Sequence, residues 1–358
     1  IAKQIKVFRD KNNRIYGYRL VDTDGVVKDL CSDALKDEIR KGNITVTNLT
    51  LTSDNRLVQK LDDDILDIHS LKMKVTKNSD GTYTLEDNET NIWFIPNNIK
   101  GKCKLPYALL ESKKPLKVIG GAGLESSESM FRDCYSAYLD LSKLDTSNII
   151  DMNNMFNNCG AKQIDLSNFN TSKVKNMESM FEYCTVPTLN LSSFDISNVI
   201  NMKTMFFQCR SKLVILNDFD LSNVKDASWI LLDCKSKFKL NKTFKQDDKI
   251  NNLINKAKVL GKEITEFSDG TYLINFEEIN IWIIPSGIIK AVINKDLAKS
   301  KKPLRVIGGQ SLVSTENMFN RCNARSIDFS KLDISSVRSA SFMFNNCTTN
   351  TVKEIKIT

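Results

Sequence analysis

A constant 25-residue period constrains this chain more strongly than any other feature of its sequence. Cysteines mark the period in one run and again in a downstream pair: Cys134, Cys159, Cys184, Cys209 and Cys234, then Cys322 and Cys347. One cysteine per period indicates a structural position in a repeat, because metal and redox motifs bring cysteines together in pairs such as C-x-x-C. Periods of roughly 20 to 50 residues are typical of solenoids, in which each unit buries its apolar side only against its neighbours.

Aligned on the cysteines, the units have closely related sequences. They read LSKLDTSNIIDMNNMFNNC (141–159), LSNFNTSKVKNMESMFEYC (166–184) and LSSFDISNVINMKTMFFQC (191–209), with divergent copies LNDFDLSNVKDASWILLDC (216–234) and FSKLDISSVRSASFMFNNC (329–347). Near the start of each unit, apolar residues such as Leu189 and Leu191 alternate with polar ones, which is the pattern of a half-buried strand. One large apolar residue then follows in each unit: Leu144, Phe169, Phe194 or Phe219. We expect these residues to stack in an internal column, beside a second column of cysteines.

The second half of each unit is predicted to be a short helix. It begins after a serine that is placed to act as an N-cap: Ser147, Ser172, Ser197 or Ser222. Val174, Met177, Met180 and Phe181 then follow at helical spacing, so that they would share one face turned toward the strand layer. The predicted fold class is therefore an α/β repeat solenoid, with a strand and a short helix in every 25 residues.

These units resemble the BspA-like leucine-rich-repeat family, whose tandem units read D-L-S-x-F-D-T-S-N-V-x-N-M-x-x-M-F-x-x-C. The match is nearly letter for letter over 139–209, fades across 210–234 and returns at 318–347. The resemblance implies a curved right-handed solenoid of the leucine-rich-repeat type, with a strand-lined face that binds proteins or surfaces. Many family members are bacterial surface proteins, and some are encoded by mobile elements. The chain departs from the family in its small number of repeats, the interruption between them and the lack of a visible wall-anchoring tail.

The repeats lie inside a longer duplication. NSDGTYTLEDNETNIWFIPNNI (78–99) recurs as FSDGTYLINFEEINIWIIPSGI (267–288), and ESKKPLKVIGG (111–121) recurs within AKSKKPLRVIGG (298–309). We predict that each KKPL(K/R)VIGG segment supplies the first rung of a stack, where a rung is one 25-residue turn of the solenoid. This register aligns Leu116 with Leu141 and Leu304 with Phe329. The β segments that carry Trp93 and Trp282 would cap these first rungs.

The duplication divides the chain into three predicted domains. Residues 1–59 are expected to form a small ββαβ(β) module, with strands at 14–20 and 44–51 and a helix from Ser32 to Gly42. Residues 60–246 form module A, with a helix, a β cap and about six rungs, and residues 247–358 form module B on the same plan with about three rungs.

A Ser–His–Asp or Cys–His catalytic arrangement would have to use the single histidine of this chain. His69 lies in LDDDILDIHSLK (61–72), which we predict to be an amphipathic helix. It has no counterpart in the predicted helix KINNLINKAKVLGK (249–262) of module B. We therefore interpret His69 as a helix-surface residue, and we expect no enzyme activity.

Two further patterns suit structure better than ligand binding. Gly120, Gly121 and Gly123 are not followed by Gly-Lys-Ser/Thr, which favours a turn between a rung and its helix over a phosphate loop. Three adjacent carboxylates at 62–64 fit the start of a helix better than a metal site. We expect neither a cofactor nor a metal.

Charge and cysteine usage constrain the partner and the compartment only loosely. The formal net charge of +8 permits an acidic partner without requiring one. No apolar run approaches the roughly 18 residues of a membrane span. The sequence begins at Ile1 and not at a methionine, so the lack of a visible signal peptide has little weight. A column of unpaired cysteines favours the reducing cytoplasm, with the cell surface as the alternative.

Two surfaces are candidates for binding. The strand face is polar and weakly acidic, and its residues are Tyr138, Asp140, Gln163, Asp165, Thr188 and Asn190. The basic region is duplicated and comprises Lys100, Lys102, Lys104, Lys113, Lys114 and Lys117 in module A, and Lys290, Lys295, Lys299, Lys301, Lys302 and Arg305 in module B. Solvation alone is a sufficient explanation for such charge runs.

The sequence thus predicts a non-enzymatic scaffold that docks a protein partner. The alternatives are an intracellular inhibitor of host defence machinery encoded by a phage or mobile element, and a bacterial surface adhesion protein. Nucleic acid is an alternative partner for the basic region. The sequence leaves the oligomeric state open.

Overall fold

The computed structural model describes residues 74–86, 88–217, 219–241 and 248–349, together with the backbone of several short strands outside these ranges. The chain divides into two compact units. Unit 1 comprises residues 1–152 and 159–173, and unit 2 comprises residues 153–158 and 174–358. Both units contain stacked rungs of a β-solenoid, so the predicted repeat solenoid is confirmed.

The first strands of unit 1 form two small antiparallel sheets. One contains β1 (Ala2–Arg9), β2 (Ile15–Asp22) and β3 (Val27–Leu30), and the other contains β4 (Leu49–Leu51), β5 (Leu57–Lys60) and β6 (Ile65–Asp67). β2 and β4 overlap the strands predicted at 14–20 and 44–51. The helix predicted from Ser32 to Gly42 lies outside the described residues. The helix predicted at 61–72 is wrong at its centre, because β6 pairs there with β5.

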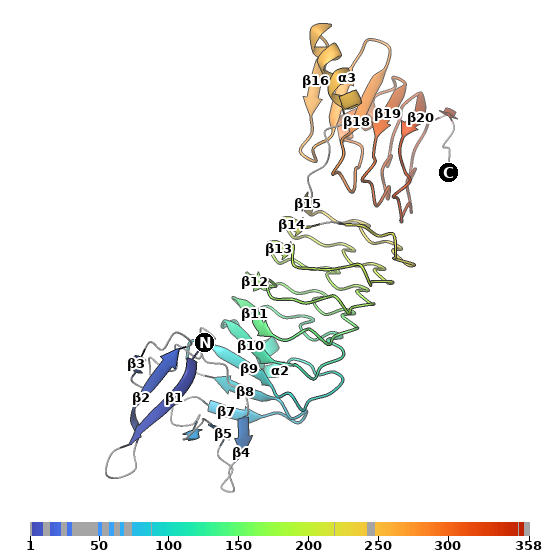
Figure 1. Cartoon of the computed structure of the whole chain (residues 1–358). Coiled ribbons are helices and arrows are strands. Elements are labelled where there is room, and N and C mark those ends of the chain that lie inside the picture. The colour runs from blue at the N-terminus through green and yellow to red at the C-terminus, as the bar shows by residue number, and fades with distance from the viewer. Residues whose placement is uncertain are drawn as a thin grey trace. The chain divides into compact units, whose positions relative to one another are not determined.

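The main sheet of unit 1 begins as a meander and continues as a parallel stack (Figure 1). Its strands are β7 (Lys74–Lys77), β8 (Tyr83–Glu86), β9 (Asn91–Ile95), β10 (Leu116–Gly120), β11 (Leu139–Leu144) and β12 (Ile164–Asp165), and the short helix α2 (Tyr107–Leu110) lies between β9 and β10 in the chain. β7, β8 and β9 are antiparallel neighbours, whereas β9 pairs in parallel with β10. The stack therefore begins at the strand that carries Trp93, one strand earlier than predicted. The wholly buried Trp93 closes the core with its ring edge against Phe131, at 6.1 Å between centroids.

Unit 2 contains a three-stranded parallel stack. It also contains a second sheet that, like the main sheet of unit 1, begins as an antiparallel meander and continues as a parallel stack (Figure 1). The stack consists of β13 (Thr188–Leu191), β14 (Leu213–Leu216) and β15 (Lys237–Leu240). This second part consists of α3 (Asp248–Val259), β16 (Glu263–Glu266), β17 (Tyr272–Asn275), β18 (Asn280–Ile284), α4 (Lys295–Lys299), β19 (Leu304–Gly308), β20 (Ser326–Leu332) and β21 (Thr351–Lys353). Helix α3 was expected from the sequence, and it packs Ile250 and Ala257 against the meander. No helix among the described residues is long and apolar enough to cross a bilayer.

The register between the first rungs differs from the predicted one. Leu116 pairs with Leu139 and not with Leu141. Likewise, Leu304 pairs with Ile327 and not with Phe329. In both copies a β-bulge interrupts the ladder and places an additional residue in the later strand. A constant sequence period therefore did not reveal this local shift.

The predicted helix of each unit is wrong, although its buried residues were identified correctly. Val174, Met177, Met180 and Phe181 have no exposed surface, but the segment that carries them is a series of turns. Ser179 and Tyr183 have positive φ angles of 54° and 55°, which an α-helix excludes. The same two positions are left-handed in the other rungs, for example at Thr204 and Gln208 or at Asn317 and Arg321.

Hydrogen bonds between rungs replace those of the helix. The N–H groups of Ser179, Phe181 and Tyr183 donate to the carbonyl oxygens of Lys203, Met205 and Phe207, at 2.9, 2.9 and 3.0 Å. The next rung repeats the pattern toward residues 228, 230 and 232. Each rung is thus bonded to the following one on its turn side as well as on its strand side. This turn ladder stabilises a backbone whose left-handed residues cost roughly 1–2 kcal/mol each.

The serines predicted as N-caps donate hydrogen bonds instead of accepting them. Ser147 donates both its N–H and its hydroxyl to Asp145 Oδ1, at 2.9 and 2.6 Å. The same Asx turn occurs at the equivalent positions of other rungs, with Ser172 on Asn170, Ser197 on Asp195 and Ser222 on Asp220. The acceptor is therefore the residue two positions before the serine, and the motif forms a turn between strand and turn ladder.

The core contains a column of stacked phenylalanines. In unit 2 the Phe181 ring lies 5.5 Å from Phe156 and 5.6 Å from Phe206, with interplanar angles of 5° and 9°. These residues belong to the M-F-x-x-C part of each repeat. The predicted spine residues Phe194 and Phe219 are also buried, and their rings lie beside this column.

The cysteines stack from rung to rung within each unit. In unit 1 the Cys159 thiol donates to the carbonyl oxygen of Cys134 at 3.3 Å, and in unit 2 Cys209 donates to Cys184 at 3.5 Å. All the cysteines of the described residues are free thiols, and only Cys347 is more than slightly exposed. The predicted column is therefore present in both units.

Truncation of the central phenylalanine tests this packing. Phe181→Ala should lower the free energy of unfolding by roughly 3–5 kcal/mol, because the ring is stacked on both faces. Phe342→Ala is the matched control, since Phe342 is 56% exposed and its loss should cost about 1 kcal/mol or less. Urea denaturation measures both changes, and equal losses would contradict this description of the core.

Candidate binding surfaces

Four of the candidate strand-face residues lie together on unit 1. Leu139 pairs with Ile164 and Asp140 pairs with Asp165, so Tyr138 and Gln163 precede the same two rungs. The side chains are held by parallel strands, which are spaced about 4.8 Å apart. Gln163 is exposed, and the other three are partly buried. We call these four residues the unit 1 strand face.

An ion pair extends this face to the preceding rung. Lys117 pairs with Asp140 in the ladder, and its Nζ lies 2.9 Å from Asp140 Oδ2. Only 3% of the Lys117 side chain is exposed. Lys117 is therefore not part of a solvated basic surface but a cation between two strands, next to two carboxylates in register.

Burial and hydrogen bonding have opposite effects on the Asp140 carboxyl. Burial disfavours its charged form, but hydrogen bonds from Ser142 and Lys117 outweigh this effect and hold the pKa of Asp140 below its usual range. The pKa of Tyr138 is raised, first by burial and then by the negative charges of Asp140 and Asp165. The face thus carries fixed negative charge beside a protonated phenol at neutral pH.

Module B has an equivalent but more open pair. Arg305 pairs with Asp328 in the ladder, and its Nε lies 2.9 Å from Asp328 Oδ2. The Arg305 side chain is 45% exposed. The pKa of Asp328 is lowered as well, because hydrogen bonds from Ser330 and Arg305 outweigh its burial.

The other basic candidates differ in their surroundings. Lys113 is exposed and lies over the Tyr135 ring, at 5.2 Å from its centroid, and Lys114 is half-buried. Lys301 is exposed. Lys302 instead donates to Asn275 Oδ1 and to the carbonyl oxygen of Phe276, both at 3.0 Å, and so ties β17 to the first rung of module B.

Thr188 and Asn190 are exposed on β13 of unit 2. They pair with Leu213 and Ile215 of β14, which pair in turn with Lys237 and Lys239 of β15. This part of the strand face therefore becomes apolar and then basic from rung to rung. It differs in chemistry from the unit 1 strand face.

The sequence analysis gave structural roles to His69, to the carboxylates at 62–64 and to the glycine run. His69 and Asp62, Asp63 and Asp64 lie outside the described residues. Gly120 and Gly121 have φ angles of 94° and 93° and form a turn at the end of β10, where a Cβ on Gly120 would lie 2.1 Å from the Ile95 oxygen. The turn predicted there is present, but the helix expected after it is not. The described ranges contain no group of three or more His, Cys, Asp or Glu side chains arranged to hold a metal ion.

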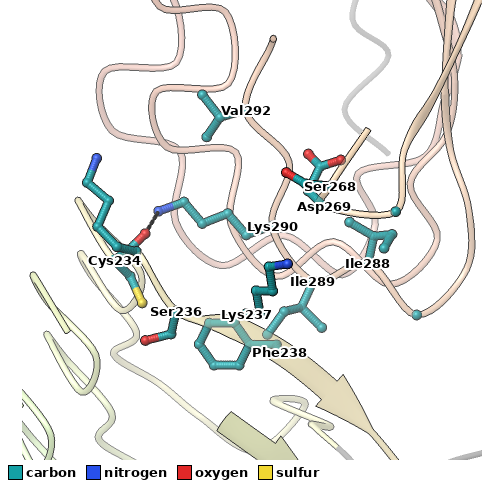
Figure 2. A pocket seen from close by; sticks show the side chains of 13 residues that line it. Cys234, Ser236, Lys237, Phe238, Ser268, Asp269, Ile288, Ile289, Lys290 and Val292 are labelled. Atoms are coloured by element: carbon teal, nitrogen blue, oxygen red, sulfur yellow. Dashed lines mark hydrogen bonds between the residues drawn. The ribbon is translucent and has the colours of Figure 1, made fainter. Parts of the chain in front are cut away.

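A cavity of about 430 Å³ lies within unit 2, between the last rung of module A and the meander of module B (Figure 2). Phe238, Ile288 and Ile289 line it together with charged and polar side chains. The Lys290 amino group points to the main chain of the last rung and donates to the oxygens of Leu231 and Cys234 (Figure 2). Burial lowers the pKa of Lys290.

Further polar contacts join the same rung to module B. Glu316 is wholly buried, and its carboxylate accepts hydrogen bonds from the hydroxyls of Ser314 and Ser339 and from the main-chain N–H of Leu231. Trp229 donates its main-chain N–H to Ser339 Oγ and its indole N–H to Ser341 Oγ, both at 3.1 Å. Asn317 donates to Asp233 at 3.4 Å. We call these contacts the junction.

The sequence placed Lys290 in a basic region and did not identify Glu316. The duplication, whose two copies are offset by 188 residues, relates both residues to module A: Lys290 corresponds to Lys102 and Glu316 to Glu128. In the structure both side chains turn toward the last rung of module A. This orientation depends on how module B packs against that rung, which no local sequence pattern encodes.

The ion pair on the unit 1 face gives a titration test. In Lys117→Met the pKa of Asp140 should rise, because burial is then opposed only by Ser142. Since the folded-state pKa of Asp140 is depressed, its stabilising effect is present above the unfolded-state value and is lost as the pH falls through the folded-state value. Carboxyl NMR titration measures the pKa. Arg305→Met is the control, and it should change the pKa of Asp328 less, because Arg305 is far more exposed.

Comparison with known proteins identifies the repeats. The family described as "Mycoplasma protein of unknown function, DUF285" matches the chain over residues 125–247 and 295–356. No curated protein and no solved structure matches the chain. The matched segments contain most of the rungs of both modules and exclude α3 and the meander of β16, β17 and β18. Because they cover just over half of the 358 residues, the chain belongs to this Mycoplasma family of unknown function, DUF285.

Proposed function

We propose that this chain is a non-enzymatic scaffold that docks a protein partner on its strand-lined side. The observation that carries the proposal is the unit 1 strand face, where Asp140 pairs with Asp165 in register and Tyr138 and Gln163 immediately precede the two strands. The interior of the rungs is filled by wholly buried side chains such as Phe131, Phe156 and Phe181. Recognition is therefore expected on the surface, where strands fix the positions of the side chains.

The chemistry of this face favours a partner with basic or hydrogen-bond-donating side chains. Asp140 and Asp165 are neighbours, and Lys117 compensates only one of the two charges. Tyrosine contributes contact area and a hydroxyl at little cost in conformational entropy. Side chains held by the ladder lose little further freedom on binding, which lowers the cost of association.

The basic region supports a nucleic-acid partner less well. Lys117 and Lys302 are engaged inside the stack, and Arg305 is paired with Asp328. Each of the two KKPL segments begins with an exposed lysine, Lys113 in module A and Lys301 in module B. We propose that these two lysines make secondary contacts and attract an acidic region of the partner by long-range charge.

A relation to the BspA-like leucine-rich-repeat family is part of the proposal. The near-identity of residues 139–209 to that family's repeat supports it, as does the parallel strand of each rung. Surface adhesion and inhibition of host machinery encoded by a mobile element are both uses of such a scaffold. They differ in partner and in compartment.

We propose the cytoplasm as the compartment because the stacked thiols of the described residues form no disulfides. Burial raises the pKa of two thiols in these columns, Cys184 and Cys322. Protonated, buried thiols react slowly with oxidants.

Counting thiols tests the compartment. Protein prepared under native conditions should react slowly with a thiol reagent, and after unfolding it should yield all nine cysteines of the sequence. A yield several thiols lower would indicate disulfides and favour the cell surface.

Capture experiments test the docking face. Immobilised wild-type chain is exposed to a soluble extract of the source organism, and the retained proteins are quantified by mass spectrometry. Gln163→Lys adds a positive charge to the acidic face and should reduce retention of the partner about tenfold or more. Gln208→Lys makes the same change on the turn side of unit 2 and should retain the partner fully.

Two results would redirect the proposal. Equal retention by Gln163→Lys and wild type would exclude the unit 1 strand face. Loss of retention in Lys113→Glu with Lys301→Glu, at unchanged melting temperature, would assign binding to the basic residues instead.

A further inference from the structure

The cavity within unit 2 is lined by more cations than anions. Lys235 and Lys237 come from the last rung of module A, and Lys290 comes from the segment that follows β18 in module B (Figure 2). The lining contains one carboxylate, that of Asp269. This carboxylate already accepts hydrogen bonds from the N–H and the hydroxyl of Thr271, at 3.0 and 2.8 Å. The cavity is therefore electrostatically suited to an anion.

Two more cations lie beside the cavity on the preceding rung. The Lys235 N–H donates to the oxygen of Cys209, next to Arg210, at 2.8 Å. The Lys237 N–H donates to the oxygen of Lys212 at 3.2 Å. All four of these basic side chains are exposed. Like charges on neighbouring strands destabilise a sheet, so their stacking has a cost that a bound anion would offset.

These cations have no internal counterions. Within the part of the chain that the structure describes, no carboxylate forms an ion pair with Arg210, Lys212, Lys235 or Lys237. By contrast, the cation between the strands of unit 1, Lys117, lies 2.9 Å from a carboxylate oxygen. The four cations beside the cavity therefore keep their capacity to bind an anion from solution.

The cavity also has an apolar wall. Phe238, Ile288 and Ile289 line it, and the edge contact of Phe238 with Phe206, at 5.4 Å between ring centroids, holds this wall in place. The cavity volume of about 430 Å³ lies within the range of small-molecule sites, roughly 300–1,000 Å³. Lysines beside an apolar wall suit a small ligand that has an anionic part and an apolar part.

We propose that this cavity binds a small organic phosphate of nucleotide size. Its phosphate groups lie on Lys235 and Lys237, and its base or other apolar part lies against Phe238 and Ile289. Lysine binds phosphate as a point charge, so no precise fork geometry is required. Because the last rung of module A and module B both line the cavity, the ligand contacts both and strengthens the junction.

The surroundings of Lys290 support an anion at this place. Its pKa is lowered, first by burial, and the charge of Lys235 adds to this effect. Glu316 and Asp233 act in the opposite direction without reversing the shift. A phosphate beside the two lysines would raise the pKa of Lys290 again, because a nearby opposite charge favours the charged form.

The phosphate site is independent of the proposed function. It lies in unit 2, whereas the docking face lies in unit 1, and it requires no chemical change in the ligand. Either proposal can therefore fail without the other.

Calorimetric titration of the full chain tests the proposal with adenosine triphosphate, inorganic tripolyphosphate and adenosine as probes. Adenosine triphosphate should bind with a dissociation constant of about 1 mM or lower. Tripolyphosphate lacks the apolar part and should bind about tenfold more weakly. Adenosine lacks the charge and should show no binding. Added salt should weaken the binding of adenosine triphosphate, and the ligand should raise the melting temperature.

Replacement of single lysines locates the site. Lys237→Gln removes a phosphate contact and should weaken the binding of adenosine triphosphate about tenfold. Lys239→Gln is the matched control, because Lys239 is exposed on the same strand but does not line the cavity. It should bind as the wild type does. Equal melting temperatures of the two variants and the wild type without ligand establish that the variants are folded.

Four results would overturn the proposal. The first is a wild type that shows no binding at about 1 mM adenosine triphosphate. The second is equal affinity for tripolyphosphate and adenosine triphosphate, which would leave the apolar wall without a role. The third is an equal loss of affinity in Lys237→Gln and Lys239→Gln. The fourth is tighter binding of a single-stranded oligonucleotide than of adenosine triphosphate, which would assign the cations to a nucleic-acid surface.

Discussion

Main-chain hydrogen bonding between rungs on the turn side is the interaction on which this structure depends. It satisfies N–H groups such as those of Ser179, Phe181 and Tyr183, which a helix would otherwise bond internally. It also holds left-handed conformations at residues other than glycine, including the β-branched Thr204. With the strand ladder on the other side, it leaves the interior to the phenylalanine and thiol columns. The polar strand face is rigid because both sides of each rung are bonded.

The same interaction explains what the sequence could predict. The period, the buried positions and the cysteine column could all be predicted from the sequence, because each is a repeated pattern of side chains. The helix was not correctly predicted, since Val174, Met177, Met180 and Phe181 face the core equally well from a helix or from these turns. The difference between the two lies in two left-handed residues per rung. Serine, asparagine, threonine, tryptophan and phenylalanine all occupy these positions, so the backbone there is imposed by the neighbouring rungs and not by residue type.

The candidate surfaces show a second limit of sequence analysis. Tyr138, Asp140, Gln163 and Asp165 were grouped correctly on unit 1, because alternation along a strand determines which side chains share a face. Lys117 was placed among the basic candidates for binding, but it is buried against Asp140. The sequence separates these residues by 23 positions and not by 25, and a β-bulge follows this pair in the ladder. A contact across such a shifted register is not visible in a periodic pattern.

The turn ladder has a consequence for how such chains can change in length over evolution. Its bonds join main-chain atoms, and the surface that a rung offers its successor resembles the one it receives from its predecessor. Duplication or loss of a whole 25-residue segment therefore preserves every bond except those at the ends. An insertion of a few residues would instead displace the left-handed positions from their partners. Genes that encode such arrays should therefore vary in length by multiples of the unit.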